Sequence, residues 1–265
     1  MKSFRQLSLF LNVMWAGFIA QVKEIVRYNS YIFSALLFPF LNLSLMVFYF
    51  RYSGQEQFLS FAVVGSGLMG IWLAATFITV YILQIERWAA TLELLIATPS
   101  SLQLWILGRS AASTLLSLVS LAITLMSARF LFGVQLVIQE PMLFLSMVLG
   151  VTITLILLGT LISSLFVLTR SAEVIVNALL YPVYLLSGVV FPIVVLPGWL
   201  QPFSLLMPLY WASLGLQAAM AGGWETVGES LLILSIMSAI FAWAATWCFR
   251  TIEQRVRKDA SLALA

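Results

Sequence analysis

Six long stretches of this sequence contain no charged residue, and they limit what the chain can fold into more than any other feature. An α-helix rises about 1.5 Å per residue, so about 20 apolar residues are needed to cross a hydrocarbon core of about 30 Å. Most of the stretches reach that length, and they do not alternate with the period of two that membrane β-strands require. The sequence therefore predicts an all-α integral membrane protein. The stretches are residues 28–50, 57–85, 110–128, 141–169, 174–224 and 230–249.

The composition excludes a soluble domain. Hydrophobic residues make up 62% of the chain and charged residues 9%, whereas roughly a quarter of the residues of a soluble protein are charged. We expect a single membrane domain over residues 1–265 with six transmembrane helices. The predicted spans are residues 30–50, 59–83, 104–132, 142–168, 173–193 and 228–249.

The distribution of lysine and arginine predicts the orientation of these spans. If the N-terminus is cytoplasmic, eleven of the 13 Lys and Arg residues fall on the cytoplasmic side, and Arg51 and Arg129 fall outside. Cytoplasmic segments of membrane proteins carry an excess of these residues. The sequence therefore predicts a multi-pass protein of the cell inner (plasma) membrane with both termini in the cytoplasm.

The N-terminal segment 5–27 has the pattern of an amphipathic helix. Apolar residues recur at helical spacing, and polar residues lie elsewhere around the helix. We expect this helix to lie on the inner membrane surface. A signal peptide and an extra short span remain alternatives. The apolar positions are Leu7, Phe10, Leu11, Met14 and Phe18, and the polar ones are Arg5, Asn12, Lys23 and Arg27.

The absence of certain residue types limits the kinds of catalytic and metal sites that this chain can form. The chain has no His and one Cys, Cys248, which excludes a His-ligated metal or haem site, a Ser–His or Cys–His nucleophile and an internal disulfide. None of its three lysines follows a glycine, so the sequence has no phosphate-binding loop. We expect no catalytic or metal site and no cofactor in this chain, and any nucleotide energy must come from another chain.

A short charged segment interrupts the apolar sequence between the second and third predicted spans. Glu86, Arg87 and Glu93 fall within eight residues, while Trp88, Leu92, Leu95 and Ile96 form one apolar face of a helix over 85–98. Pro99 ends that helix, because it disfavours helical geometry at the residue before it. The pattern predicts a short cytoplasmic helix at the membrane surface, which is either a plain connector or a docking element.

The longest charge-free region, 174–224, is too long for one span and contains five of the eight prolines. Regular helix cannot continue through such spacing without kinks. We expect the fifth span to end near Pro192, followed by a re-entrant hairpin of short helices over 194–222. Irregular backbone at membrane depth is tolerated where it is buried in protein or lines water. The region is therefore either an exit gate or a packed outer loop.

Two motifs resemble the membrane subunits of type-2 ATP-binding-cassette exporters. "ERWAATLELLIATP" resembles the cytoplasmic loop of these permeases, with Ala90 where the family usually has Gly, and "SGVVFPIVVLPGWLQPFSLLMPLYW" resembles their signature near the fifth span. The first motif is matched by Glu86, Arg87, Thr91, Leu92, Glu93 and Pro99. The second is matched by Gly188, Phe191, Pro192, Leu196, Pro197 and Pro208.

The resemblance implies a role for each segment. The 85–98 helix would be the coupling helix that docks into a separate ATPase subunit, which binds ATP and Mg, and the 187–211 region would be the gate. A second permease chain, identical or related, would complete the pathway, and nucleic acid is not expected as a partner. No span carries an acid or base at its midpoint, which argues against a proton-coupled carrier or ion channel. An amphipathic or lipid-linked substrate fits better.

Two other functions stay open on the sequence alone. One is an integral-membrane enzyme of lipid metabolism, and the other is a membrane assembly subunit without transport of its own.

Overall fold

The computed structural model describes residues 2–27, 29–88, 95, 101–166 and 172–259. This part of the chain folds into helices joined by short connections. The longer helices are α1 (Lys2–Arg27), α2 (Asn29–Tyr52), α3 (Leu59–Leu73), α4 (Thr79–Trp88), α6 (Leu102–Phe130), α7 (Pro141–Phe166), α8 (Ala172–Leu186), α10 (Pro208–Ala221) and α11 (Trp224–Asp259). The shorter helical pieces are η1 (Glu56–Phe58), η2 (Ala74–Ile78), η3 (Ile193–Val195) and α9 (Gln201–Ser204).

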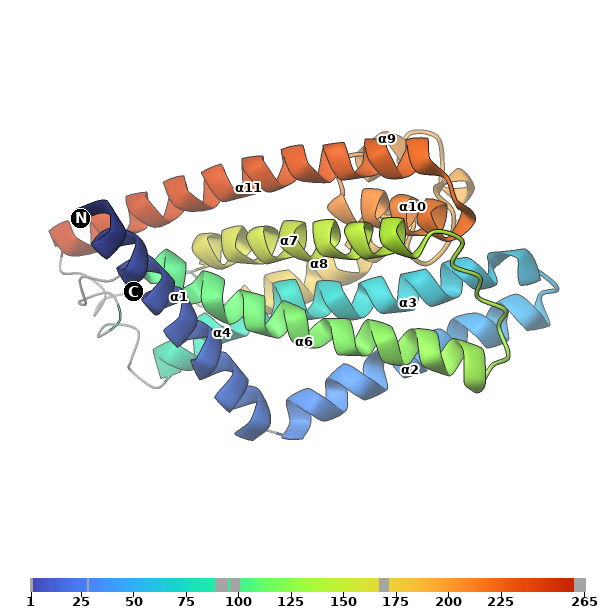
Figure 1. The fold of residues 1–265 in the computed structure, drawn as a ribbon, viewed down its shortest axis with the longest axis horizontal. Helices are drawn as coiled ribbons and strands as arrows, with labels where there is room; N and C mark the ends of the chain where they lie inside the picture. The colour runs from blue at the N-terminus through green and yellow to red at the C-terminus, as the bar shows by residue number, and fades with distance from the viewer. Residues whose placement is uncertain (1, 28, 89–94, 96–100, 167–171, 260–265) are drawn as a thin grey trace.

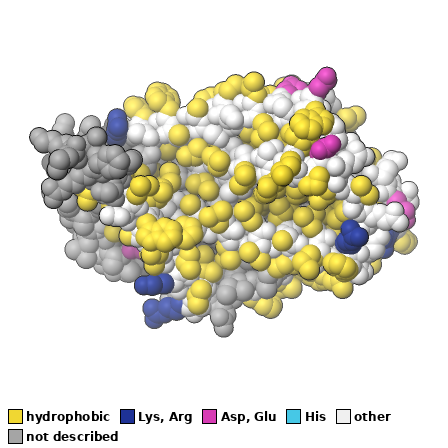
Figure 2. Space-filling view, in the orientation of Figure 1, with side chains coloured by type: hydrophobic (Ala, Val, Ile, Leu, Met, Phe, Trp, Pro, Cys, Tyr) yellow, Lys and Arg dark blue, Asp and Glu magenta, His cyan; other side chains and the backbone are white. Residues whose placement is uncertain are grey.

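The helices form an elongated bundle with two distinct ends (Figure 1). Helices α3, α6, α7 and α11 run along its long axis, and α1 crosses one end obliquely. The beginning of α1 and the end of α11 lie at that end, while α9 and α10 lie at the opposite one. In Figure 2 hydrophobic side chains spread over the visible face, and charged side chains lie towards its two ends. This distribution suits a bundle whose middle is embedded in lipid.

Each predicted span contains a helix, but the six-span count is not established. Five helices among the described residues are long and apolar enough to cross a membrane. The first predicted span lies in α2, where the stretch Leu37–Tyr52 is apolar but shorter than these five. The fifth lies in α8, which has 15 residues. The five candidates are Leu9–Arg27, Glu56–Thr76, Leu102–Phe130, Pro141–Leu165 and Trp224–Ile252.

The second predicted span is not a regular α-helix. Helices α3 and α4 are joined by the π-helical turn η2, so helical structure runs from Leu59 to Trp88. A π-turn widens the helix and disturbs its carbonyl pairing. Side chains compensate here: the Thr76 hydroxyl donates to the Trp72 carbonyl at 2.7 Å, and Ser163 of α7 donates to the Thr79 carbonyl at 3.2 Å.

The predicted end of the fifth span, near Pro192, is wrong. Helix α8 ends at Leu186 and contains Pro182 in its interior. The chain leaves the helix at Gly188, whose φ of 67° lies in the left-handed region. A residue without a Cβ adopts this conformation at little cost, so glycine commonly follows a helix end. A glycine ends this helix, and the prolines shape the segment that follows it.

The core lies where α3, α7 and α10 meet. Trp72 of α3, Met147 of α7 and Leu216 of α10 are all buried in one apolar cluster. Helix α8 joins this cluster through Tyr184, whose hydroxyl donates to the Met69 carbonyl at 3.1 Å. Helix α6 packs with a row of small buried residues that lets neighbouring helices approach closely. These are Ser110, Ser113, Thr114, Ser117, Ser120, Thr124 and Ser127.

Candidate functional site

The most unusual side chain in the bundle is Arg109, which is buried near the start of α6. Only 2% of its side chain is exposed. It is the eighth residue of α6, so its Cα lies about 10 Å along the helix from the first residue. A buried guanidinium is costly unless charged and polar groups surround it. The residues that bind the Arg109 guanidinium therefore define a candidate functional site.

Three acceptors from two other helices surround the Arg109 guanidinium. Nη1 donates to Glu86 Oε1 at 2.6 Å, and Nη2 donates to Glu24 Oε2. Nε donates to Gln21 Oε1 at 2.8 Å. The two carboxylate side chains are 15% and 16% exposed, so both ion pairs lie largely out of solvent. We call Gln21, Glu24, Glu86 and Arg109 the arginine cluster.

The fork geometry of arginine explains why this residue type occupies the position. A guanidinium presents five N–H donors in a rigid plane and can bind several acceptors at once, whereas a lysine ammonium is a compact point charge. Trp105, one turn earlier on α6, adds a further contact: its ring centroid lies 4.7 Å from Arg109 Cζ. A cation over an aromatic face is stabilised further when it is desolvated. The cluster thus joins α1, the last turn of α4 and α6.

Helices α1 and α6 also touch through their backbones beside the cluster. A Cβ placed on Gly108 would overlap the Met14 carbonyl, and one placed on Gly17 would overlap the Trp105 carbonyl. Only glycine allows the helix axes to approach this closely. Because Gly108 precedes Arg109 directly, the close contact and the ion pairs occupy the same turn of α6.

The residues of the predicted coupling helix are only partly described. Glu86 and Arg87 lie in the last turn of α4, and Thr91, Leu92, Glu93 and Pro99 lie outside the described residues. Leu95, predicted on the apolar face, packs against a cluster of Leu102, Ile106 and Phe249. Residues 85–88 continue α4, so the predicted separate helix does not begin at residue 85. Apart from Leu95, the remainder of 85–98 lies outside the described residues.

Two features of this end differ from what the sequence suggested. Glu86, which the resemblance assigns to the docking helix, has its carboxylate bound to Arg109 within the chain. Arg109 was counted only as a cytoplasmic charge, and Gln21 and Glu24 were not singled out. A signal for Arg109 was present, since an ionisable residue inside an apolar helix marks a functional position. Its partners are distant in the sequence and could not be read from it.

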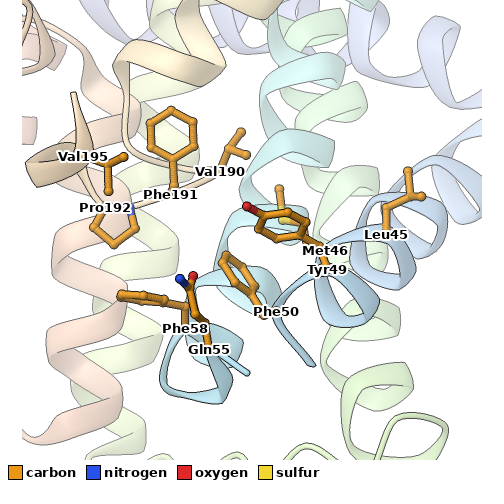
Figure 3. A pocket seen from close by; sticks show the side chains of 10 residues that line it. All are labelled: Leu45, Met46, Tyr49, Phe50, Gln55, Phe58, Val190, Phe191, Pro192 and Val195. Carbon is orange, nitrogen blue, oxygen red and sulfur yellow. The ribbon is translucent and has the colours of Figure 1, made fainter. Parts of the chain in front are cut away.

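At the opposite end, the segment after α8 forms one wall of a cavity of about 790 Å³. Phe191 and Pro192 face Tyr49 and Phe50 of α2 across it (Figure 3). The lining is mostly apolar, with Tyr49 and Gln55 as its polar side chains. The complete lining is Leu45, Met46, Tyr49, Phe50, Gln55, Phe58, Val190, Phe191, Pro192 and Val195.

A second cavity, of about 290 Å³, lies on the other side of the same segment. Its lining includes the polar side chains Ser187, Tyr210, Ser213 and Gln217. Pro192 contributes to both cavities. Residues 188–195 therefore lie between two cavities, and the role of this segment as a gate stays a prediction.

The six predicted gate residues divide into two groups. Gly188, Phe191 and Pro192 lie together in the segment between the cavities. The other three line neither of these cavities: the Leu196 carbonyl accepts from Gln201 Nε2 at 3.1 Å, Pro197 is exposed, and Pro208 is buried at the start of α10.

Comparison with known families identifies the protein family to which this chain belongs. Residues 12–221 match the model of the ABC-2 type transporter family. The chain belongs to the ABC-2 type transporter family. The match begins within α1 and ends with α10, so it contains the arginine cluster and both cavities. No curated protein matches the chain in sequence.

Family membership gives the chain its general role. It is the membrane-embedded, transmembrane part of an ABC transporter, and the apolar helices agree with a multi-pass membrane protein. This ABC-2 permease carries two sites at opposite ends of its bundle. The arginine cluster lies where α1 crosses the bundle, and the cavities lie near α9 and α10.

Proposed function

We propose that this chain forms the substrate pathway of an ATP-driven exporter and that a separate ATPase subunit supplies the energy. The family match over residues 12–221 carries the proposal. Family members are membrane transport components that work with an ABC ATPase. ATP and Mg would be bound by that partner, because this sequence has no phosphate-binding loop.

The ATPase would bind at the end of the bundle where α1 starts and α11 stops. Most Lys and Arg residues belong to the sequence segments at this end, while Arg51 and Arg129 lie at the ends of α2 and α6 furthest from it. Lys and Arg are concentrated in cytoplasmic segments, so the distribution supports a cytoplasmic location for both termini. The end of α4, which carries Glu86 and Arg87 of the coupling motif, and the start of α6 lie on this side.

Helix α1 would lie at the cytoplasmic membrane surface. It crosses the bundle obliquely in Figure 1. Gln21 and Ile25 face the bundle and are buried, whereas Leu9, Phe10 and Trp15 are exposed by more than half of their surface. An amphipathic helix binds the interface by inserting such an apolar face among the lipids. The exposed side of α1 supports this placement.

The cavity between α2 and the 188–195 segment would be part of the outward route. Pockets that bind ligands are mostly apolar with a few polar groups, and the lining matches this description. It suits an amphipathic or lipid-linked molecule better than an ion. The segment would act as the gate, and 194–222 would re-enter the membrane from outside.

A second permease chain would complete the pathway. Helices α2 and α8 expose large apolar side chains, including Tyr49, which lines the larger cavity, and Tyr181. Such surfaces are covered by lipid or by protein. Pairing through these faces would bring two gate segments together, in either a homodimer or a heterodimer.

Co-expression with an ABC ATPase subunit encoded beside this chain tests the proposal. The two chains are expected to co-purify in detergent, and the complex is expected to hydrolyse ATP. The permease purified alone is the control and is expected to show no hydrolysis. ATP hydrolysis by the isolated permease, or a failure of every neighbouring ATPase to bind it, would refute the proposal.

A further inference from the structure

Resting on the proposed function, we propose that the arginine cluster is a rigid connection that makes α1, α4 and α6 move as one body. Motion received at the cytoplasmic end of α4 then passes to α6 and α1 together. Helix α1 therefore takes part in transmitting this motion. The positioning residues of this connection are Arg109, Glu24, Glu86 and Gln21.

The position of the cluster in the chain supports a role in transmission. Glu86 lies two residues before the end of α4, and Arg109 lies in the second full turn of α6. These helices flank the segment with the family's coupling motif. A displacement of that segment reaches the bundle through both helices. The 2.6 Å ion pair between Glu86 and Arg109 makes the two ends of the segment move together.

The connection to α1 is of a different kind. Glu24 and Gln21 bind the same guanidinium from α1, and the glycine contact at Gly108 fixes the two helices at backbone distance. A loosely held surface helix would need neither feature. Helix α1 is therefore held in one orientation with respect to α6, and it cannot stay at rest when α6 tilts.

Stability alone does not account for such a cluster. Desolvation makes buried ion pairs expensive, and replacing a whole buried cluster by apolar residues of similar volume is often neutral or stabilising. The cluster also leaves Gln21 Nε2 and Glu24 Oε1 buried without a partner among the described residues. An apolar contact would let the helices slide, whereas directed hydrogen bonds from one rigid guanidinium fix their mutual orientation.

This reasoning defines a variant that separates stability from coupling. Glu24→Leu, Glu86→Leu and Arg109→Met together remove all three charges and leave none of them unpaired. If the cluster only stabilises the bundle, the gate of the triple variant responds to nucleotide as in wild type, although Gln21 loses its hydrogen bond to Arg109. If it transmits motion, the triple variant inserts and binds the ATPase, but the gate no longer responds to nucleotide. Arg129→Met, at the other end of α6, is the matched control.

The readout is the gate itself. A single cysteine replaces Val195, which is 69% exposed in the segment between the two cavities, in a Cys248→Ser background. Its labelling rate with a membrane-impermeant maleimide is measured on the permease–ATPase complex, without nucleotide and with ADP·vanadate trapped. The wild-type complex and the Arg129→Met control are expected to show a nucleotide-dependent change in rate, and the triple variant is expected to lose it.

The outcomes separate the two proposals. A complex that never forms, or a wild-type gate that ignores trapped nucleotide, overturns the proposed function. A triple variant whose gate keeps the wild-type response to nucleotide overturns the proposal that the cluster is a rigid connection. Arg109→Lys serves as a second variant if the triple variant fails to accumulate. Lysine retains the charge but cannot hold three acceptors in one plane, so the same loss of the nucleotide response is expected. A full response in Arg109→Lys would refute the proposed rigid connection.

Discussion

Arg109 Nη1 lies 2.6 Å from Glu86 Oε1, although the two residues are 23 positions apart in the sequence. The pair connects α4 with α6 on either side of the segment that contains the coupling motif. Both partners are largely buried, and Glu24 shares the same guanidinium. An ion pair in this place has consequences for stability that can be measured separately from transport.

Arg109→Ala should destabilise the permease strongly. The substitution leaves Glu24 and Glu86 without their cation in a largely desolvated site, and breaking a buried pair in this way costs about 3–5 kcal/mol. We expect reduced membrane abundance and a lower melting temperature in detergent. Arg129→Ala is the control, because Arg129 is exposed at the end of the same helix and surface changes usually cost within about 0.5 kcal/mol. Equal melting temperatures for both variants would contradict the prediction.

Gly108→Ala and Gly228→Ala should have opposite effects, although both replace a glycine inside a helix. A Cβ at Gly108 overlaps the Met14 carbonyl, whereas a Cβ at Gly228 meets no atom within 4 Å. Overpacking at Gly108 costs about 1–3 kcal/mol, and Ala at Gly228 gains up to about 1 kcal/mol of helix propensity. Thermal unfolding in detergent and limited proteolysis of α1 measure the difference. Similar shifts at both positions would show that α1 does not pack on α6 this closely.

Gly188→Ala should impair the gate and leave the rest of the bundle in place. Gly188 has a φ of 67°, and a Cβ there would lie 2.6 Å from Ile193 Cγ2. The left-handed conformation alone costs a residue with a side chain about 1–2 kcal/mol. We expect export to fall while the ATPase still co-purifies. Gly198→Ala, where a Cβ meets no atom within 4 Å, should export normally. Loss of export in both variants would argue against a specific role for the turn at Gly188.

How much of this architecture the sequence predicts depends on the kind of interaction. Charge-free stretches locate the long helices because each must present an apolar surface over its own length. Helix ends depend on single backbone conformations, and the end of α8 was therefore misplaced from Gly188 to Pro192. The partners of Arg109 depend on which helices meet in three dimensions. No local pattern records that Gln21 and Glu24 lie beside it.

The larger cavity beside the predicted gate was only partly predictable for a similar reason. The proline spacing indicated irregular structure after the fifth span, and the motif indicated Phe191 and Pro192. The opposite wall of the larger cavity comes from Tyr49 and Phe50 in α2, about 140 positions earlier in the sequence. Such pairings depend on the packing of whole helices, which a motif within one segment does not specify.

Glu93→Arg tests the coupling motif, which lies outside the described residues. If Glu93 contacts the ATPase in a buried charge pair, reversing its sign costs about 2–5 kcal/mol of association free energy, which is a loss of ten-fold to several thousand-fold in affinity. We expect normal membrane abundance, weak co-purification with the ATPase and loss of export. Glu253→Arg, in the C-terminal basic tail, is the control. A Glu93→Arg variant that binds and exports like wild type would make the 85–98 segment a plain connector.

The orientation of the chain predicts which single cysteines an impermeant reagent reaches in intact cells. In a Cys248→Ser background, cysteines at Ser53 and Gly223 should react from outside, because these turns lie at the end of the bundle with few cations. A cysteine at Ser261 should react only after the membrane is permeabilised. Reaction at 261 in sealed cells would reverse the proposed topology.

The π-helical turn at Ala74–Ile78 sets the register of everything that follows it in α4. A single extra residue in a helix rotates all later side chains by about 100° around the axis compared with an uninterrupted α-helix, since each residue advances by 1/3.6 of a turn. Glu86 lies ten positions after Thr76, and the rotation is carried through the helix between them unchanged. Were the turn regular, a neighbour in the sequence would occupy the angular position of Glu86. The irregularity in the middle of the second span therefore decides, from a distance, which side chain Arg109 meets.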